Sequence, residues 1–210
     1  MYKLVIFDFD GTLADSFGWF LDVFDEVADR FRFRRLERDR LDHLRGLSTK
    51  ALLRYHGVPL WKVPMIAAHA RRLQGQNLQA ITVFNGMDTV VAQLRGKGVR
   101  LALVTSNAHA NVARILPAET LAAFDRVSCG ASLLGKTHKF RAVLKAAHIA
   151  PADALAIGDE LRDIEAARAT GIAAGAVAWG YALPERLRRE GPDHFFDRPE
   201  DITALFEKRG

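Results

Sequence analysis

The sequence predicts an α/β fold, in which an open, mostly parallel sheet carries helices on both faces and a small all-helical module follows the first strand. From about residue 81 onward, short apolar runs alternate with helical patterns, as in parallel sheets. Residues 16–80 interrupt this alternation with helical patterns and no convincing strand. The 210 residues, 49% of them apolar, are enough for one core and one modest insert.

The first predicted strand, Lys3–Phe7, is a short β-prone run of the kind that a parallel sheet buries on both faces. Further strands are predicted, in chain order, at 99–105, 126–129, 154–158, 173–179 and 194–196. Helices are predicted between them at 88–97, 138–147 and 160–170. Gly98 and Gly171 end two of these helices, and Pro184 and Pro199 open two more.

The insert is predicted from an amphipathic stripe over 17–31 and from further helical patterns over 47–55 and 61–73. We therefore predict an α/β core domain of residues 1–15 and 81–210, and a helical domain of residues 16–80. The arginine-rich run 30–40 is interpreted as a solvated helix end and loop. Three histidines of the insert lack metal-ligand spacing and are interpreted as surface or packing residues: His43, His56 and His69.

Composition limits the functional classes. The net charge of +5, from 30 basic and 25 acidic residues, and the pI of about 9.6 are compatible with nucleic acid, an acidic membrane surface or an anionic small substrate. The single Cys129 excludes an internal disulfide framework and a cysteine-based zinc site. No segment approaches the roughly 20 apolar residues of a membrane helix. We expect a cytoplasmic protein without a membrane partner.

Two acids stand where a parallel sheet binds ligands. Asp8 and Asp10 directly follow the first strand, and Gly11 allows a sharp turn after them. Two carboxylates this close repel each other unless a cation lies between them. Oxygen ligands suit Mg²⁺, so we predict a magnesium site here. The alternative is a capping aspartate beside a solvated one.

Polar residues also follow later predicted strands. Thr105 and Ser106 end one strand with a hydroxyl group and backbone N–H groups that suit a phosphate, although Thr-Ser-Asn is also a common helix cap. Asn107 either orients the phosphate or caps the helix. Asp159 ends another strand, and Asp163 follows it by one helical turn. If a helix begins between them, both acids reach one metal ion.

A lysine near the start of the 138–147 helix is locally unfavourable with the helix dipole. That cost is tolerable when Lys136 contacts a phosphate and the Asp8 carboxylate. Lys139 competes for this role one turn later, and we prefer Lys136 because it precedes the predicted helix beside Gly135. The alternative for Lys136 is an ordinary exposed lysine.

The segment Asp8-Phe-Asp-Gly-Thr12 resembles the first motif of the haloacid dehalogenase-like hydrolase superfamily, whose members are mostly Mg²⁺-dependent phosphatases with a Rossmann-like core. The residues around Thr105, Lys136 and Asp159 are similar to its second, third and fourth motifs. Residues 166–171 and 179–181 resemble the phosphoglycolate-phosphatase-like branch.

This resemblance implies that Asp8 is a nucleophile that forms an aspartyl-phosphate and that Asp10 is the general acid and base. It implies that the Asp8 carboxylate, the Asp10 backbone carbonyl and Asp159 bind Mg²⁺, with Asp163 a further ligand or the partner of one. It also assigns phosphate binding to three residues: Thr105, Ser106 and Lys136.

The resemblance makes residues 16–80 a C1-type cap over the site. Within residues 44–50, Arg45 and Lys50 either contact an anionic part of the substrate or face solvent. We predict a Mg²⁺-dependent phosphomonoesterase for a small anionic metabolite. The alternatives are a sugar phosphomutase, a nucleotide or nucleic-acid phosphatase, and a non-catalytic binding module. Nucleic acid is disfavoured because only residues 30–35 interleave arginine with aromatic residues. The substrate and the choice between monomer and dimer stay open.

Overall fold

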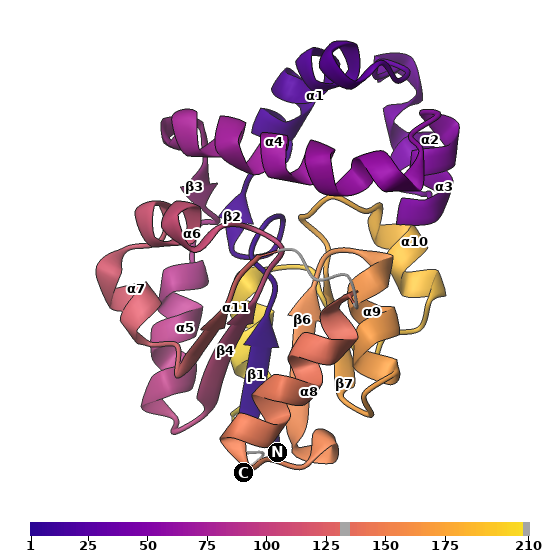
Figure 1. The fold of residues 1–210 in the computed structure, drawn as a ribbon. Coiled ribbons are helices and arrows are strands. Elements are labelled where there is room, and N and C mark those ends of the chain that lie inside the picture. Colours follow the sequence, from indigo (N-terminus) through magenta and orange to yellow (C-terminus); the bar gives the residue numbers. More distant parts are fainter. Residues whose placement is uncertain (131–134, 208–210) are drawn as a thin grey trace.

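A computed structural model describes residues 1–130 and 135–207. Six strands form one sheet in the order β5-β4-β1-β6-β7-β8, and every neighbouring pair is parallel (Figure 1). The strands are β1 (Leu4–Phe7), β4 (Arg100–Val104), β5 (Arg126–Ser128), β6 (Ala154–Gly158), β7 (Ala173–Val177) and β8 (His194–Phe196). The predicted parallel α/β fold is confirmed.

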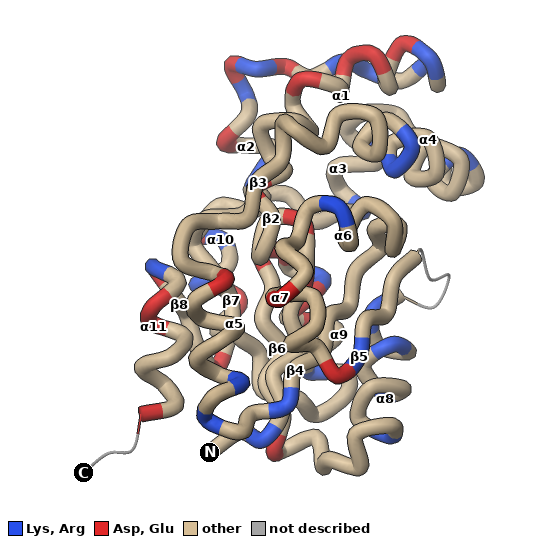
Figure 2. Tube along the Cα trace, turned by 90° about the vertical axis from the view of Figure 1, so that its left-hand side faces the viewer, with Lys and Arg blue, Asp and Glu red and all other residues tan. Residues whose placement is uncertain are grey.

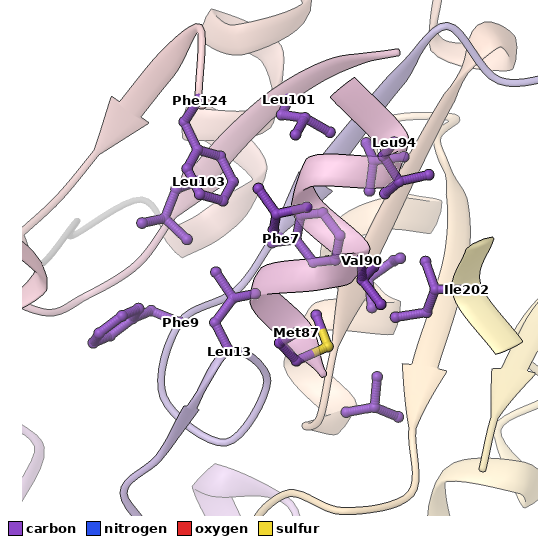
Figure 3. Packing of buried hydrophobic residues seen from close by; sticks show 14 of the residues in the cluster. Phe7, Phe9, Leu13, Met87, Val90, Leu94, Leu101, Leu103, Phe124 and Ile202 are labelled. Carbon is purple, nitrogen blue, oxygen red and sulfur yellow. The ribbon is translucent and has the colours of Figure 1, made fainter. Parts of the chain in front are cut away.

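Side chains of β1 alternate between two buried clusters, as the pleat of a strand requires. Val5 and Phe7 pack with α5 (Met87–Gly96), α6 (His109–Ile115) and α11 (Pro199–Ala204), while α7 (Ala118–Ala122) lies beside α5. Leu4 and Ile6 pack with α8 (Gly135–Ala147), α9 (Leu161–Arg168) and α10 (Pro184–Arg189) on the other face. Figure 3 shows Phe7 between strand residues and helix α5.

The insert consists of α1 (Phe17–Phe31), α2 (Leu41–Arg45), α3 (Thr49–Tyr55) and α4 (Val63–Gln76), with short 3₁₀ turns at Arg38–Arg40, Leu60–Lys62 and Leu78–Ala80. All of residues 16–80 are described, and none of them forms a strand. The helices lie beyond the carboxyl ends of the sheet strands (Figure 1). The division into two domains remains our prediction.

Several short elements depart from the sequence prediction. The two-residue strands β2 (Ala14–Asp15) and β3 (Thr82–Val83) pair antiparallel at the two ends of the insert, and they are too short to show alternation. Helices α2, α6 and α7 are not predicted by the sequence, because five to seven residues span fewer than two turns of the amphipathic pattern. Helix α8 begins at Gly135 rather than 138, so Lys136 lies in its first turn and not in a preceding loop.

The arginine-rich run 30–40 contains a left-handed helix cap at Arg32 and a 3₁₀ turn, and several of its arginines are paired within the insert. Arg35 contacts Asp29 at 2.6 Å, and Arg34 and Arg40 flank Glu37. Figure 2 shows charges of both signs interspersed along the outer part of the insert. These pairs agree with a solvated surface. No helix in the described part of the chain is long and apolar enough to cross a membrane.

Candidate active site

Parallel pairing of β1 with β6 brings two of the predicted acids to the same edge of the sheet. Phe7 is in register with Ile157, so Asp8 and Asp159 follow neighbouring strand ends. Gly158 is needed here because a Cβ atom would lie only 2.3 Å from the Asp163 Oδ2 atom. Gly11, with a left-handed φ of 76°, leaves similar room beside Asp159.

The described residues contain one group of acids with metal-binding spacing. One carboxylate oxygen from each of Asp8, Asp159 and Asp163 lies within 4.8 Å of the others, and all three residues are buried. Asp163 is oriented by the capping box of α9, in which its carboxylate accepts the Glu160 N–H at 3.0 Å. Three buried carboxylate oxygens fit a hard divalent cation such as Mg²⁺.

Asp159 is also fixed by two donors from other segments. The Thr12 hydroxyl donates to its Oδ1 atom at 3.0 Å, and the Tyr181 N–H donates to its Oδ2 atom at 2.8 Å. Burial raises the pKa of Asp159 well above its usual value, and the nearby charges of Glu160 and Asp8 raise it further. A bound cation would favour the ionised form of this carboxyl group.

Asp8 and Lys136 form a buried ion pair. The Lys136 Nζ atom lies 2.5 Å from the Asp8 Oδ2 atom and also contacts Asp163, and its side chain is 10% exposed. Burial raises the pKa of Asp8 to about 6, against the opposing attraction of Lys136. Burial opposes the charge of Lys136, yet the carboxylates of Asp163 and Asp8 raise the pKa of this lysine above its usual value.

Lys139, the alternative to Lys136, faces backbone oxygens. Its ammonium group donates to the carbonyl oxygens of Thr105, Ser128 and Gly130 at 2.6, 3.3 and 2.5 Å. Burial lowers the pKa of Lys139. This lysine therefore ties α8 to the ends of β4 and β5. Phosphate binding by Lys136 remains a prediction that its contact with Asp8 supports.

Asp10 lies apart from the three-acid group and is held by side-chain amides. Gln74 Nε2 donates to its Oδ1 atom at 2.9 Å, and Asn107 Nδ2 donates to its Oδ2 atom at 2.9 Å. The Gln74 Oε1 atom accepts from Asn107 at 2.6 Å and from Asn111 at 3.3 Å. Gln74, a buried residue of α4, was missed in the sequence because no motif surrounds it.

The end of β4 places the other predicted phosphate-binding groups. Thr105 is buried, and its Oγ1 atom accepts the Asn107 N–H at 2.9 Å. Ser106 is exposed, and its carbonyl oxygen accepts from Arg71 of α4 at 3.4 Å. Asn107 is not the N-cap residue of α6, because Ala108 occupies that position, and orientation of the phosphate by Asn107 stays a prediction. Its Oδ1 atom accepts the Ala108 N–H at 2.8 Å, while its amide group holds Asp10.

The two cap cations behave differently from each other. Arg45 donates to the carbonyl oxygens of Tyr181 at 2.9 Å and Gly180 at 3.0 Å, and its guanidinium lies 5.1 Å from the Phe17 ring centre. Lys50 is exposed on α3. Arg45 therefore ties the insert to the loop after β7, and a contact of Lys50 with substrate stays a prediction. Of the three histidines, His43 is exposed, while His56 and His69 are buried packing residues.

A cavity of about 420 Å³ lies between the insert and the strand ends. Asp10, Ser106 and Asn107 line it on the core side. Apolar side chains of α1, α2, α3 and α4 form most of the opposite wall. The site thus has a polar floor at the sheet and a largely apolar roof.

A family model described as "Haloacid dehalogenase-like hydrolase" matches residues 5–177. The chain is 31% identical over 201 residues to a phosphoglycolate phosphatase of Synechococcus elongatus, with 95% of each chain covered. It is also 31% identical to the tyrosine-protein kinase PtkA of Mycobacterium tuberculosis over 85% of this chain and 63% of that one. The crystal structure of a putative phosphoglycolate phosphatase from Lactobacillus plantarum has a TM-score of 0.82 to this chain at 22% identity, covering 98% of this chain and all of that one.

Proposed function

Because the chain belongs to the haloacid dehalogenase-like hydrolases and is a phosphatase similar to phosphoglycolate phosphatases, we propose that it cleaves monoesters of small metabolites through an aspartyl-phosphate on Asp8. The observation that carries this proposal is the buried Asp8 carboxylate, paired with Lys136 and flanked by Asp159 and Asp163. Such a carboxylate is largely shielded from water and faces the Lys136 ammonium group, whose charge can neutralise a phosphate oxygen.

In the first step, an Asp8 oxygen attacks phosphorus, and the bond between phosphorus and the ester oxygen breaks. Asp10 donates a proton to the departing alcohol oxygen. In the second step, Asp10 takes a proton from a water molecule that attacks phosphorus, which releases inorganic phosphate and restores the Asp8 carboxylate. The amides of Gln74 and Asn107 hold Asp10 in one orientation for both proton transfers.

Three further groups are proposed to hold the oxygens of the transferred phosphoryl group: the Thr105 hydroxyl, the Ser106 N–H and the Lys136 ammonium. Lys136 is the strongest of these, because its charge is buried and its hydrogen bonds to a phosphate are charge-assisted. Asp8 and Asp159, with Asp163 or the Asp10 backbone carbonyl, would hold Mg²⁺. When bound, this ion reduces the repulsion between a carboxylate nucleophile and an anionic phosphate.

Substitution of the nucleophile tests the proposal. We expect Asp8→Asn to lower kcat for 4-nitrophenyl phosphate by at least about a thousandfold, because the amide oxygen is a poor nucleophile. Asp15→Asn changes an exposed carboxylate of β2 and should leave kcat unchanged. After acid quenching during turnover of a substrate with a labelled phosphate, the wild-type enzyme should carry the label and Asp8→Asn should not. Near-normal turnover by Asp8→Asn would refute the mechanism. Rapid phosphate release by the wild type would also separate a phosphatase from a phosphomutase.

A further inference from the structure

The roof of the cavity is largely apolar, and most of its apolar side chains are only partly buried. Among the described residues of the insert, only Trp19 is a buried member of either hydrophobic cluster, and Phe20, Val23 and Leu73 pack against the same cluster from partly buried positions. Helix α3 has no buried residue, although Leu52 and Leu53 both line the cavity. The insert therefore leaves apolar surface lining a cavity of about 420 Å³, within the usual range of small-molecule sites.

Aromatic residues of α1 and of the segment after it form one side of this cavity. The ring centres of Phe20 and Phe24 are 5.4 Å apart, and Phe24 lies 5.7 Å from Phe33. All three residues line the cavity. Flat apolar rings of this kind favour an apolar group over a charged one, because a charged group here would lose its hydration.

The charged side chains around the cavity already have partners. Arg45 is held by two backbone carbonyls, and Arg162 is paired with Glu160 at 2.8 Å. Arg71 is hydrogen-bonded to Ser106 O, at the strand end where the phosphate is proposed to bind. These arginines do not form a second anion site inside the apolar roof.

We propose that the preferred substrates of this phosphatase are phosphate monoesters whose organic part is an alkyl or aryl group, and that this group occupies the roof cavity while the phosphate lies at Asp8. The inference rests on the proposed function, since it deepens the description of the same site. It is carried by the continuity of the cavity from Asp10 and Asn107 to the apolar faces of α1, α3 and α4.

A homologous series of substrates tests this proposal. We would measure kcat/KM for ethyl, butyl and hexyl phosphate, with 2-phosphoglycolate as the charged comparator. Each added methylene should raise kcat/KM about fourfold by leaving water. The carboxylate of 2-phosphoglycolate should place it below butyl phosphate. A kcat/KM that does not change with alkyl length, or that is highest for 2-phosphoglycolate, would overturn the inference while leaving the proposed function in place.

A pair of variants on α4 locates the effect. Ala67 lines the cavity, whereas its neighbour Ala68 is exposed. Ala67→Phe should lower the ratio of kcat/KM for hexyl over ethyl phosphate at least tenfold, and Ala68→Phe should leave the ratio unchanged. Equal ratios in both variants and the wild type would place the alkyl group elsewhere and refute the proposal.

Calorimetry with alkyl phosphonates, which are not hydrolysed, distinguishes failure of the proposed function from failure of the cavity assignment. It uses the wild-type protein and so does not depend on any variant. The wild-type protein should bind hexylphosphonate about fifteenfold more tightly than butylphosphonate, because two methylenes are buried. Tighter binding of hexylphosphonate than of butylphosphonate, without hydrolysis of any phosphate ester, would refute the proposed function while showing that the cavity is apolar. Equal affinities with normal turnover would refute the cavity assignment alone.

Discussion

At the residue scale, Gln74 links the insert to Asp10 in the core. Its amide group donates to the proposed general acid Asp10 at 2.9 Å, and its carbonyl oxygen accepts from Asn107 and Asn111. A neutral donor to a carboxylate both orients it and stabilises its charge. We therefore propose Gln74 as a positioning residue, which would act on the reaction through Asp10.

We expect Gln74→Leu to lower kcat about tenfold to a hundredfold with little change in KM, because one hydrogen bond to a charged group contributes about 1.5–3 kcal/mol. A leucine of similar volume has no amide group, so Asp10 would be held by Asn107 alone. Steady-state kinetics with 4-nitrophenyl phosphate would measure the effect.

Gln76→Leu provides the matched control, because Gln76 is exposed on the same helix. It should retain wild-type kinetics. An equal loss in both variants, or a loss in Gln74→Leu that appears in KM rather than kcat, would show that Gln74 supports the helix and not Asp10.

The sequence predicts the positions of the acids at the strand ends better than it predicts the side chains that contact them. Asp8 and Asp159 follow apolar strands, and parallel strands deliver such residues to one edge of a sheet. The contact between Gln74 and Asp10 spans 64 positions and joins an insert helix to a core loop. No periodicity reports such a contact, because it depends on how the insert lies over the sheet.

At the scale of elements, one carboxylate joins a helix and two strands of the core. Asp125, just before β5, accepts the N–H of Leu101 in β4 at 2.9 Å and the guanidinium of Arg95 in α5 at 3.0 Å. Burial alone would raise the pKa of Asp125, but the Leu101 N–H and Arg95 more than offset it and lower the pKa below the usual value. The carboxylate is thus more stable in the folded state than in the unfolded one.

We expect Asp125→Asn to lower the free energy of unfolding by about 1 kcal/mol at pH 7, because a charge-assisted interaction is weakened at a partly solvated site. The folded pKa lies below the unfolded value of about 3.9. The stabilisation is therefore complete above pH 4 or so and is lost as pH falls through the folded pKa.

Urea unfolding at pH 7 and near pH 3 would measure this difference. The difference in the free energy of unfolding between the wild type and Asp125→Asn should be smaller at the lower pH. Asp39→Asn, which changes an exposed carboxylate, should alter stability little at either pH. A gap that is the same at both pH values would contradict the ionic explanation.

Long elements of the fold follow from their patterns, and short ones do not. The six core strands and helix α1 carry apolar runs or stripes that the sequence displays directly. Helix α8 starts three residues earlier than predicted, which places Lys136 in its first turn. The two buried carboxylates that Lys136 faces offset its unfavourable position near the helix dipole.

At the scale of the whole molecule, three buried carboxyl groups lie close enough to repel one another when ionised, beyond the carboxyl ends of β1 and β6. We expect EDTA to abolish phosphatase activity and Mg²⁺ at about 100 times its Kd to raise the Tm by roughly 5–10 °C, since binding then contributes about 2.7 kcal/mol. Thermal scans with and without Mg²⁺ would measure the shift.

Asp159→Asn should remove most of this shift by taking one charged ligand from the group. Asp42→Asn, at an exposed position on α2, should keep it. A shift of the same size in both variants, or full activity after EDTA treatment, would contradict a metal site at these acids.

The pairing of β2 with β3 has a consequence for how such proteins diversify. The chain leaves the core and returns to it through two strands held side by side, so residues 16–80 begin and end at almost the same point. A segment attached in this way can lengthen, shrink or be exchanged for another without altering the order of the sheet strands, because the closure cost barely depends on its length. Evolution can thus change the segment that lies over the strand ends while the acids at those ends keep their places.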